Sequence, residues 1–341
     1  MITRNGLGSL HSLAATLLVW ALASSGQAAP LHRAATPRVP QAPAAEQKSL
    51  RAGRVPQFQA LPLERSGQNH LLVRAFINDK PALLGVDTGA PVSAIALTRV
   101  AHFGMTPAPA NSEIPTRVRI NGSFAGVVMA QGLRLGALNL IDEPMVAVDL
   151  GSSSKAAKMM NEQPIDGLLG ADILFPTAAV LDCRAQILIL KVDPNARGTA
   201  PGVSYAGFSR VPIHVSAGYN LYVDGALNGK PAKLMIDTGA YGTLLNQRFV
   251  RSMRIPLRDT PFRSAGVNLK QRGVQLATIS KFAVGLVNMR SKEVGVIDLA
   301  GLVHGGMLDA SPPVAGLLGS EILQRHSAII DFGSRTLYLK R

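Results

Sequence analysis

Cysteine is nearly absent from this chain of 341 residues, and the single thiol, Cys183, excludes any intramolecular disulfide. The fold therefore has to be stabilised by packing of the apolar residues, which make up 47% of the sequence. Cys183 lies in an apolar stretch with no histidine close by in the sequence to activate it. We interpret it as a buried structural residue rather than a nucleophile.

Aromatic residues are also scarce, at 5% of the chain, and the only tryptophan is Trp20. Surfaces that bind nucleic acids usually combine basic clusters with stacking aromatic side chains. The formal net charge of +14 is therefore not interpreted as the sign of a nucleic-acid partner. An anionic envelope surface or an acidic protein region suits this charge better.

The motifs of several enzyme classes are missing. The seven histidines show no metal-binding spacing such as His-Glu-x-x-His, and the chain has neither a Gly-x-Ser-x-Gly elbow nor a phosphate-binding loop. These absences argue against a zinc enzyme, a serine hydrolase and a nucleotide-dependent enzyme. We expect no metal and no organic cofactor.

Glycine and proline, by contrast, are plentiful, with 33 and 22 residues, whereas charged residues are only 16% of the chain. This composition is typical of many short strands and turns rather than long solvated helices. The length suits two domains of roughly 140 residues each. The sequence therefore predicts a mainly β protein with two domains.

An internal repeat defines these domains. Asp-Thr-Gly-Ala occurs at residues 87–90 and again 150 positions later at residues 237–240, each time directly after an apolar strand. Between residues 69–90 and 219–240, eleven of 22 positions are identical. Both segments contain an Asn-Asp or Asn-Gly turn signal, which predicts a hairpin before each acidic motif.

A second marker of the repeat is Gly-Leu-Leu-Gly, found at residues 167–170 and 316–319. The offset of 149 means that one deletion separates the halves, which we place at residues 56–197 and 205–341. Short helices are expected where apolar residues recur at helical spacing, over residues 96–103 and 245–253, and strands elsewhere.

The paired strand, Asp-Thr-Gly-Ala and Gly-Leu-Leu-Gly pattern resembles the pepsin-like and retropepsin-like aspartic proteases over nearly the whole chain from Phe58. The resemblance implies a mainly β fold of two homologous β-barrel lobes, related by a pseudo-two-fold axis, with the active cleft between them. It further implies that Thr88 and Thr238 bond across the axis to the opposite loop. The implied catalytic residues are Asp87 and Asp237, supported by Thr88, Gly89, Thr238 and Gly239.

Two carboxyl groups a few ångströms apart cannot both ionise, so one of them holds a proton at working pH, as the separated pKa values of the pepsin pair illustrate. The ionised member can then take a proton from a water that attacks the peptide carbonyl, while the other donates a proton to the carbonyl oxygen. The expected partner is a peptide or protein substrate. Because both halves lie in one chain, a monomer suffices.

A hairpin signal between Thr116 and Met129 marks the candidate substrate-covering flap. Its tip would be formed by Asn121, Gly122, Ser123 and Phe124, with residues 264–266 as a looser counterpart in the second half. An ordinary surface turn is the alternative for both segments.

Other acidic residues recur with the fold rather than with the Asp-Thr-Gly motif. We interpret Asp172 and Glu321 as residues that bond a turn or cap a short helix, and Asp182 and Asp331 as hairpin-turn residues. Asp166 has no acidic counterpart in the second half, which predicts an asymmetric cleft.

The first 28 residues have the features of an export signal: Arg4, an apolar run from Leu13 to Leu22, and small residues before a cleavage site after Ala28. A periplasmic or secreted protein follows, with an uncleaved membrane anchor as the alternative. Residues 29–55 are rich in Pro, Ala and Arg and predict a disordered linker, or else a pro-segment whose basic residues cover the carboxylates.

The leading hypothesis is thus an exported aspartic endopeptidase. The alternative is an envelope protein that binds peptides or polymers and retains the fold with weak or no catalysis. Both Asp-Thr-Gly triplets are intact, which favours the enzyme.

The residue after each Asp-Thr-Gly predicts the pH dependence. Pepsin-like enzymes usually carry Ser or Thr there, whereas Ala90 and Ala240 offer no hydroxyl to the aspartate. Losing a hydrogen bond to the ionised form raises carboxyl pKa values, so we expect peptide hydrolysis to be fastest at mildly acidic pH. A pH–rate profile with its optimum in the strongly acidic range of pepsin would contradict this expectation.

Overall fold

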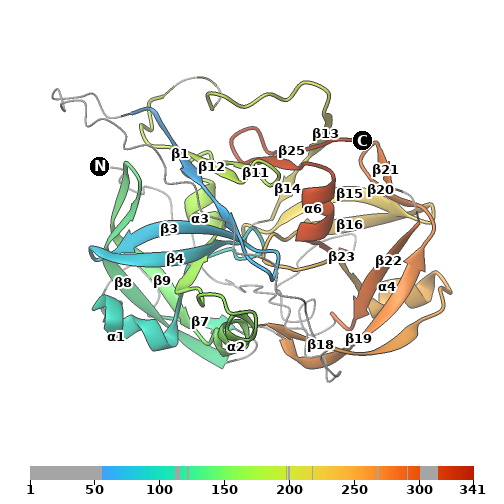
Figure 1. Ribbon diagram of the computed structural model, residues 1–341, viewed down its shortest axis with the longest axis horizontal. Helices are drawn as coiled ribbons and strands as arrows, with labels where there is room; N and C mark the ends of the chain where they lie inside the picture. The colour runs from blue at the N-terminus through green and yellow to red at the C-terminus, as the bar shows by residue number, and fades with distance from the viewer. Residues whose placement is uncertain are drawn as a thin grey trace, which may run out of the picture.

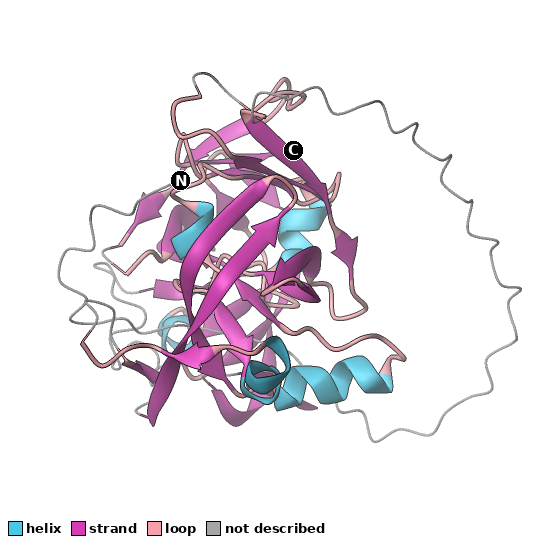
Figure 2. Ribbon diagram, turned by 90° about the vertical axis from the view of Figure 1, so that its left-hand side faces the viewer, coloured by secondary structure: helices cyan, strands magenta, loops and turns pink. Residues whose placement is uncertain are grey.

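The computed structural model describes residues 56–111, 116–120, 123–196, 198, 200–216, 218–266, 269–289, 291–299 and 314–341. Strands dominate this part of the chain (Figure 2). The predicted fold class is confirmed: the protein is mainly β and has two homologous halves.

Within the described ranges, no helix has the length and apolar character needed to cross a membrane. The predicted export signal and linker, residues 1–28 and 29–55, lie outside the described residues.

Each half begins with the predicted hairpin. In the first half the turn residues Asn78 and Asp79 have φ angles of 48° and 62°, and in the second half Asn228 and Gly229 have 50° and 81°. Two consecutive positive φ angles are the geometry that Asn-Gly and Asp-Gly turns favour in two-residue hairpins. The hairpin strands are β3 (Leu71–Ile77) with β4 (Lys80–Val86), and β15 (Leu221–Leu227) with β16 (Lys230–Ile236).

Six strands of the first half close into a barrel within the described residues. The order is β3-β4-β10-β5-β9-β8, and β8 pairs back onto β3. The Gly-Leu-Leu strand β10 runs parallel to β4, so it reaches the acidic motif at the same end. The further elements of this half are β2 (Glu64–Arg65), β5 (Ala94–Ala96), η1 (Leu97–Arg99), α1 (Val100–Phe103), β6 (Thr106–Pro107), β7 (Arg117–Ile120), β8 (Ser123–Leu135), β9 (Leu138–Val148), α2 (Gly151–Met159), β10 (Gly167–Leu169) and α3 (Ala171–Leu174).

The second half repeats this order as β15-β16-β23-β17-β22-β19. The long strand β8 corresponds here to two strands, because β19 is followed by β20, and β20 pairs with β15. The elements are β14 (His214–Val215), β17 (Leu244–Asn246), α4 (Gln247–Ser252), β18 (Arg258–Gly266), β19 (Leu269–Ile279), β20 (Phe282–Val284), β21 (Val287–Met289), β22 (Lys292–Ile297), β23 (Val314–Leu318) and α6 (Ser320–Arg325).

A third sheet joins the two halves, which lie side by side in Figure 1. Its two middle strands come from different halves and pair antiparallel, with Leu181 opposite Ile330. These residues are related by the offset of 149, so the pseudo-two-fold axis passes between them. The sheet order is β1 (Phe58–Pro62), β12 (Ile187–Lys191), β11 (Val180–Asp182), β24 (Ile329–Asp331), β25 (Thr336–Leu339) and β13 (Ser209–Pro212).

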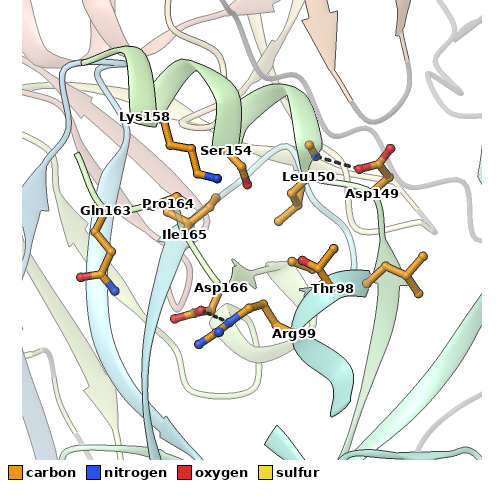
Figure 3. A pocket seen from close by; sticks show the side chains of 13 residues that line it. Thr98, Arg99, Asp149, Leu150, Ser154, Lys158, Gln163, Pro164, Ile165 and Asp166 are labelled. Atoms are coloured by element: carbon orange, nitrogen blue, oxygen red, sulfur yellow. Dashed lines mark hydrogen bonds and ion pairs between the residues drawn. The ribbon is translucent and has the colours of Figure 1, made fainter. Parts of the chain in front are cut away.

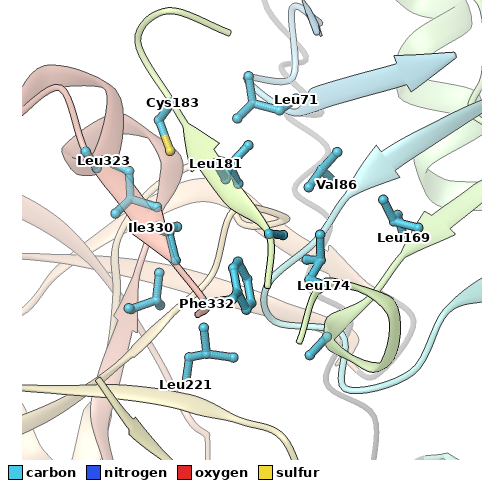
Figure 4. Close-up of a cluster of buried hydrophobic side chains, with 14 of the residues drawn as sticks. Leu71, Val86, Leu169, Leu174, Leu181, Cys183, Leu221, Leu323, Ile330 and Phe332 are labelled. Atoms are coloured by element: carbon cyan, nitrogen blue, oxygen red, sulfur yellow. The ribbon is translucent and has the colours of Figure 1, made fainter. Parts of the chain in front are cut away.

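The apolar core is continuous across this junction. Leu181 and Ile330 are fully buried and belong to one cluster with Leu174 of the first half and Leu221 of the second (Figure 4). Cys183 lies in the same cluster, and burial raises the pKa of its thiol to about 12. The interpretation of Cys183 as a buried structural residue is therefore confirmed.

The helix predictions are only partly correct. Residues 97–103 are helical, as η1 and α1, in agreement with the expected helix over 96–103. The expected helix over 245–253 begins two residues later, because Leu245 and Asn246 end strand β17 and the Asn246 side chain accepts from the Arg248 N–H as the N-cap. Helix α2 was not expected at all, since residues 151–159 are polar and show little helical periodicity.

Candidate active site at the junction of the halves

The two acidic motifs begin directly after the parallel strand pairs described above. The Asp87 N–H donates to the Leu169 carbonyl (3.0 Å), and the Asp237 N–H donates to the Leu318 carbonyl (3.1 Å). Each Gly-Leu-Leu strand therefore holds the first residue of an acidic loop. Each strand is followed by a glycine, Gly170 or Gly319, where a β-carbon would collide with the backbone of the loop.

Reciprocal hydrogen bonds between the two threonines link the loops. The Thr88 N–H donates to the Thr238 hydroxyl (3.0 Å), and the Thr238 N–H donates to the Thr88 hydroxyl (3.1 Å). Each hydroxyl also donates to the carbonyl before the opposite aspartate, Thr88 to Ile236 (2.9 Å) and Thr238 to Val86 (2.7 Å). These buried bonds run from one half to the other, as the resemblance implies.

The glycine of each motif lies against the opposite aspartate. A β-carbon at Gly89 would lie 2.6 Å from the Asp237 carboxyl carbon, and one at Gly239 would collide equally with the Asp87 carboxyl group. No side chain larger than hydrogen can occupy these positions at this separation. The glycines therefore allow the two carboxyl groups to approach each other.

Both carboxyl groups are buried, with exposed fractions of 1% for Asp87 and 0% for Asp237. Asp87 Oδ1 accepts from the Gly89 N–H (2.8 Å), and Asp237 Oδ1 accepts from the N–H groups of Gly239 and Ala240 (both 2.9 Å). Both Oδ2 atoms are buried and have no hydrogen-bond partner among the described residues. The pair thus presents two carboxyl oxygens that the protein itself does not use.

The environment of the pair opposes ionisation. Burial raises the pKa of Asp87, although backbone N–H groups partly offset this effect. Burial also raises the pKa of Asp237, and the charge of Asp87 raises it further. Two interacting carboxyl groups of this kind lose their protons in separate steps, so the pair holds one proton over a range of pH.

Other polar residues support the two loops differently. In the first half Ser93 donates to Asp172 (2.7 Å) and accepts from the Gly170 N–H (3.0 Å). In the second half the Ser320 hydroxyl donates to the Thr238 carbonyl (2.9 Å), while Glu321 pairs with Lys292 (3.2 Å). Asp172 therefore bonds the residue that follows the acidic loop, in line with the turn-bonding alternative, and Glu321 forms an ion pair; neither residue is the N-cap of its helix.

The two hairpin-turn acids have the expected role. Asp182 Oδ1 accepts from the N–H groups of Arg184 and Ala185 (3.0 and 2.8 Å), and Asp331 Oδ1 accepts from the Ser334 N–H (2.9 Å). Both carboxylates hold the turn that follows their strand, so this interpretation is confirmed.

Sequence reasoning missed a contact of the first half with the second acidic loop. His70 is buried close to the backbone of Gly239, and the Asn69 amide donates to the Tyr241 carbonyl (3.2 Å). Burial lowers the pKa of His70 to about 4, so the ring is neutral near pH 7. The available signal was that the repeat diverges here, with Tyr219 and Asn220 at the equivalent positions.

The candidate flap is described only in part. Strands β7 and β8 pair antiparallel, with Ile120 opposite Ser123, as the hairpin signal predicts. Asn121 and Gly122 lie outside the described residues, and Ser123 and Phe124 are described only as part of β8. In the second half, residues 264–266 end strand β18, which pairs with β19 as another antiparallel pair.

Comparison with known families agrees with this geometry. A family model described as aspartyl protease matches the chain twice, over residues 73–173 and 223–322. Each match contains one Asp-Thr-Gly motif and one Gly-Leu-Leu-Gly segment. A search of curated proteins found no match.

The threonine network predicts a stability difference between two substitutions. Replacing Thr238 with Val keeps the shape but leaves the buried Thr88 N–H and Val86 carbonyl without partners. We expect the free energy of unfolding to fall by about 2–4 kcal/mol, whereas Thr238→Ser, which keeps the hydroxyl, costs much less. Urea unfolding of both variants measures this difference, and equal losses would contradict the proposed importance of the hydroxyl.

The raised pKa of Asp87 predicts that the effect of Asp87→Asn on the free energy of unfolding depends on pH. The folded state holds a proton that the unfolded chain releases near pH 4, so the stability contributed by the protonated carboxyl is complete below that pH and is lost as the pH rises through the folded-state pKa. Asparagine does not titrate. Urea unfolding from about pH 4 to pH 8 should therefore show that the free energy of unfolding of the variant increases relative to that of the parent as the pH rises. A difference that does not change with pH would refute the assignment.

Proposed function

Since this chain belongs to the aspartyl protease family, we propose that it is an exported endopeptidase that hydrolyses peptide bonds with a water molecule held between Asp87 and Asp237. The observation that carries this proposal is the pair of buried carboxyl groups that approach each other over Gly89 and Gly239. Their Oδ2 atoms are the groups available to a reacting water and to the substrate carbonyl.

The proposed reaction uses the single proton of the pair. The ionised aspartate removes a proton from water as the water oxygen bonds to the peptide carbonyl carbon, while the protonated aspartate donates its proton to the carbonyl oxygen. The tetrahedral intermediate then breaks its carbon–nitrogen bond as the nitrogen takes a proton from the aspartate that received one from water. The other aspartate takes a proton from one of the two hydroxyl groups, so a carboxylic acid and an amine are released and the pair again holds one proton. All atoms come from the peptide and one water, so the step needs no metal and no cofactor.

The threonine network supports this chemistry by fixing the carboxyl groups in place. A small displacement of either loop would separate the pair, and the reciprocal bonds of Thr88 and Thr238 resist that displacement. Because both loops belong to one chain, a monomer is the proposed active form.

The substrate is proposed to be an extended peptide that binds between the halves by strand pairing and side-chain contacts. The net charge of +14 favours binding of the protein to acidic protein segments or to an anionic envelope surface. Cleavage after Ala28 would place the protein in the periplasm or outside the cell, with residues 29–55 as a linker or a pro-segment.

Substitution of the aspartates tests the catalytic assignment. Asp87→Asn and Asp237→Asn each remove one titratable member of the pair, so we expect either change to abolish cleavage of a mixed peptide library, with a loss of at least about 1,000-fold in kcat/KM. Pepstatin should inhibit the parent protein. Asp79→Asn, an exposed aspartate in a turn, serves as the matched control and should leave the rate unchanged.

Two results would overturn the proposal. Cleavage that survives both substitutions and pepstatin would mean that other groups are responsible. A folded parent protein that binds library peptides at acidic and neutral pH without cleaving any of them would instead favour the peptide-binding alternative.

A further inference from the structure

A cavity of about 520 Å³ lies in the first half, away from the paired aspartates. Helix α2 forms one side of it, and the end of β5 with η1 and the segment before β10 form the others (Figure 3). The side chains that can bond a ligand come from three different parts of the chain: Thr98, Arg99, Asp149, Ser154, Lys158, Gln163 and Asp166.

Arg99 is held in place at this cavity. Its Nε donates to the Asp166 carboxylate (2.6 Å), whose second oxygen accepts from the Leu83 N–H (2.9 Å). Asp166 is only 5% exposed, so its charge is neutralised by this arginine rather than by water. Asp166 occupies the Nε hydrogen, which leaves the terminal amino groups of the guanidinium to meet a ligand.

Helix α2 adds a second positive charge and a hydroxyl group. Ser154 and Lys158 are four residues apart, so they share one face of the helix, and Figure 3 shows both side chains directed into the cavity. Lys158 is exposed and has no ion-pair partner among the described residues. Asp149 lies at the margin, where its Oδ1 accepts from the Gly151 N–H (2.8 Å) at the start of the helix.

Strand β10 connects the cavity to the loop of Asp87. Ile165 and Asp166 line the cavity, and the Leu169 carbonyl, a few residues further along the chain, binds the Asp87 N–H. A strand rise of about 3.3 Å per residue puts the two places about 10–13 Å apart, the length of three or four residues of an extended peptide. Helix α2 also contacts β18 of the second half, so it lies where the halves meet (Figure 1).

We propose that this cavity binds the carboxylate side chain of a glutamate or aspartate in the substrate, three or four residues from the bond to be cleaved. The inference rests on the proposed protease function and adds a substrate class to it. Arg99 and Lys158 supply the positive charges, and Ser154 supplies a hydroxyl donor.

The second half does not repeat the Arg99–Asp166 ion pair. The positions equivalent to Arg99 and Asp166 are Phe249 and Ala315, so the ion pair is replaced by two apolar side chains. An acidic residue is therefore recognised on one side of the scissile bond only. The sequence predicted an asymmetric cleft because Asp166 has no acidic counterpart in the second half, and the ion pair of Asp166 with Arg99 is the chemical difference between the halves at this place.

Binding of labelled peptides to the Asp87→Asn protein tests the proposal without requiring cleavage. The probes are fluorescein-labelled decapeptides with Phe-Leu at the centre and alanine elsewhere, in which a single Glu, or Gln as its neutral match, is moved through the flanking positions. Fluorescence anisotropy should show Glu bound about three- to tenfold more tightly than Gln at a position three or four residues from the centre, on one side only.

Three substitutions on that background assign the preference to the cavity. Lys158→Met should reduce the Glu preference to nearly one. Asp149→Asn keeps an acceptor for the Gly151 N–H but removes a negative charge, so it should increase the Glu preference. Lys155→Met is the matched control, because Lys155 is an exposed lysine of the same helix that does not line the cavity. Arg99 is left intact, since its removal would leave Asp166 buried without a partner.

Several outcomes would overturn the inference: no Glu preference at any position, no binding of any peptide, an equal loss in Lys155→Met and Lys158→Met, or a decrease in Asp149→Asn. Cleavage of the same peptides by the parent protein reports separately on the catalytic proposal. A Glu preference in binding without any cleavage would support the cavity proposal and contradict the protease function. Cleavage without a Glu preference would support the protease function and overturn the cavity proposal.

Discussion

The reciprocal hydrogen bonds of Thr88 and Thr238 are the constraint on which the rest of the site depends. They tie together two loops that lie 150 residues apart in the chain and bring two carboxyl groups into a buried position that each group alone would avoid. The threonines use their own N–H and hydroxyl groups for this, so the backbone polar groups between the halves are satisfied. The continuous core and the sheet shared by β11 and β24 hold the halves in the same relation.

Symmetry at the axis is combined with asymmetry around it. The loops have the same bonds, but the groups that support them differ: Ser93 with Asp172 in one half, and Ser320 with Thr238 in the other. His70 reaches across to the Gly239 backbone. A symmetric pair of carboxyl groups can share one proton, whereas an extended peptide has a direction, so the surroundings of the pair have to differ if that direction is to be recognised.

Much of the fold could be predicted from local signals. The hairpin turns at Asn78 and Asn228 depend on residues that tolerate positive φ, and such preferences are visible in the sequence. Helix α2 was missed because its polar residues lack a periodic apolar face, and the helix after β17 was placed too early because Leu245 is apolar in a strand as well as in a helix. The cross-half contacts of Asn69 and His70 depend on distant neighbours, which no local pattern records.

The sequence by itself determined the repeat, the two acidic turns and the residue types that allow them, because strand periodicity, turn preference and glycine positions are properties of short segments. Only the tertiary structure decided that the two carboxyl groups meet, that burial raises their pKa values, and that Arg99 and Lys158 line one cavity with Asp166. Each of these depends on distances between residues far apart in the chain, and proximity and loss of solvent exist only once the halves have packed together.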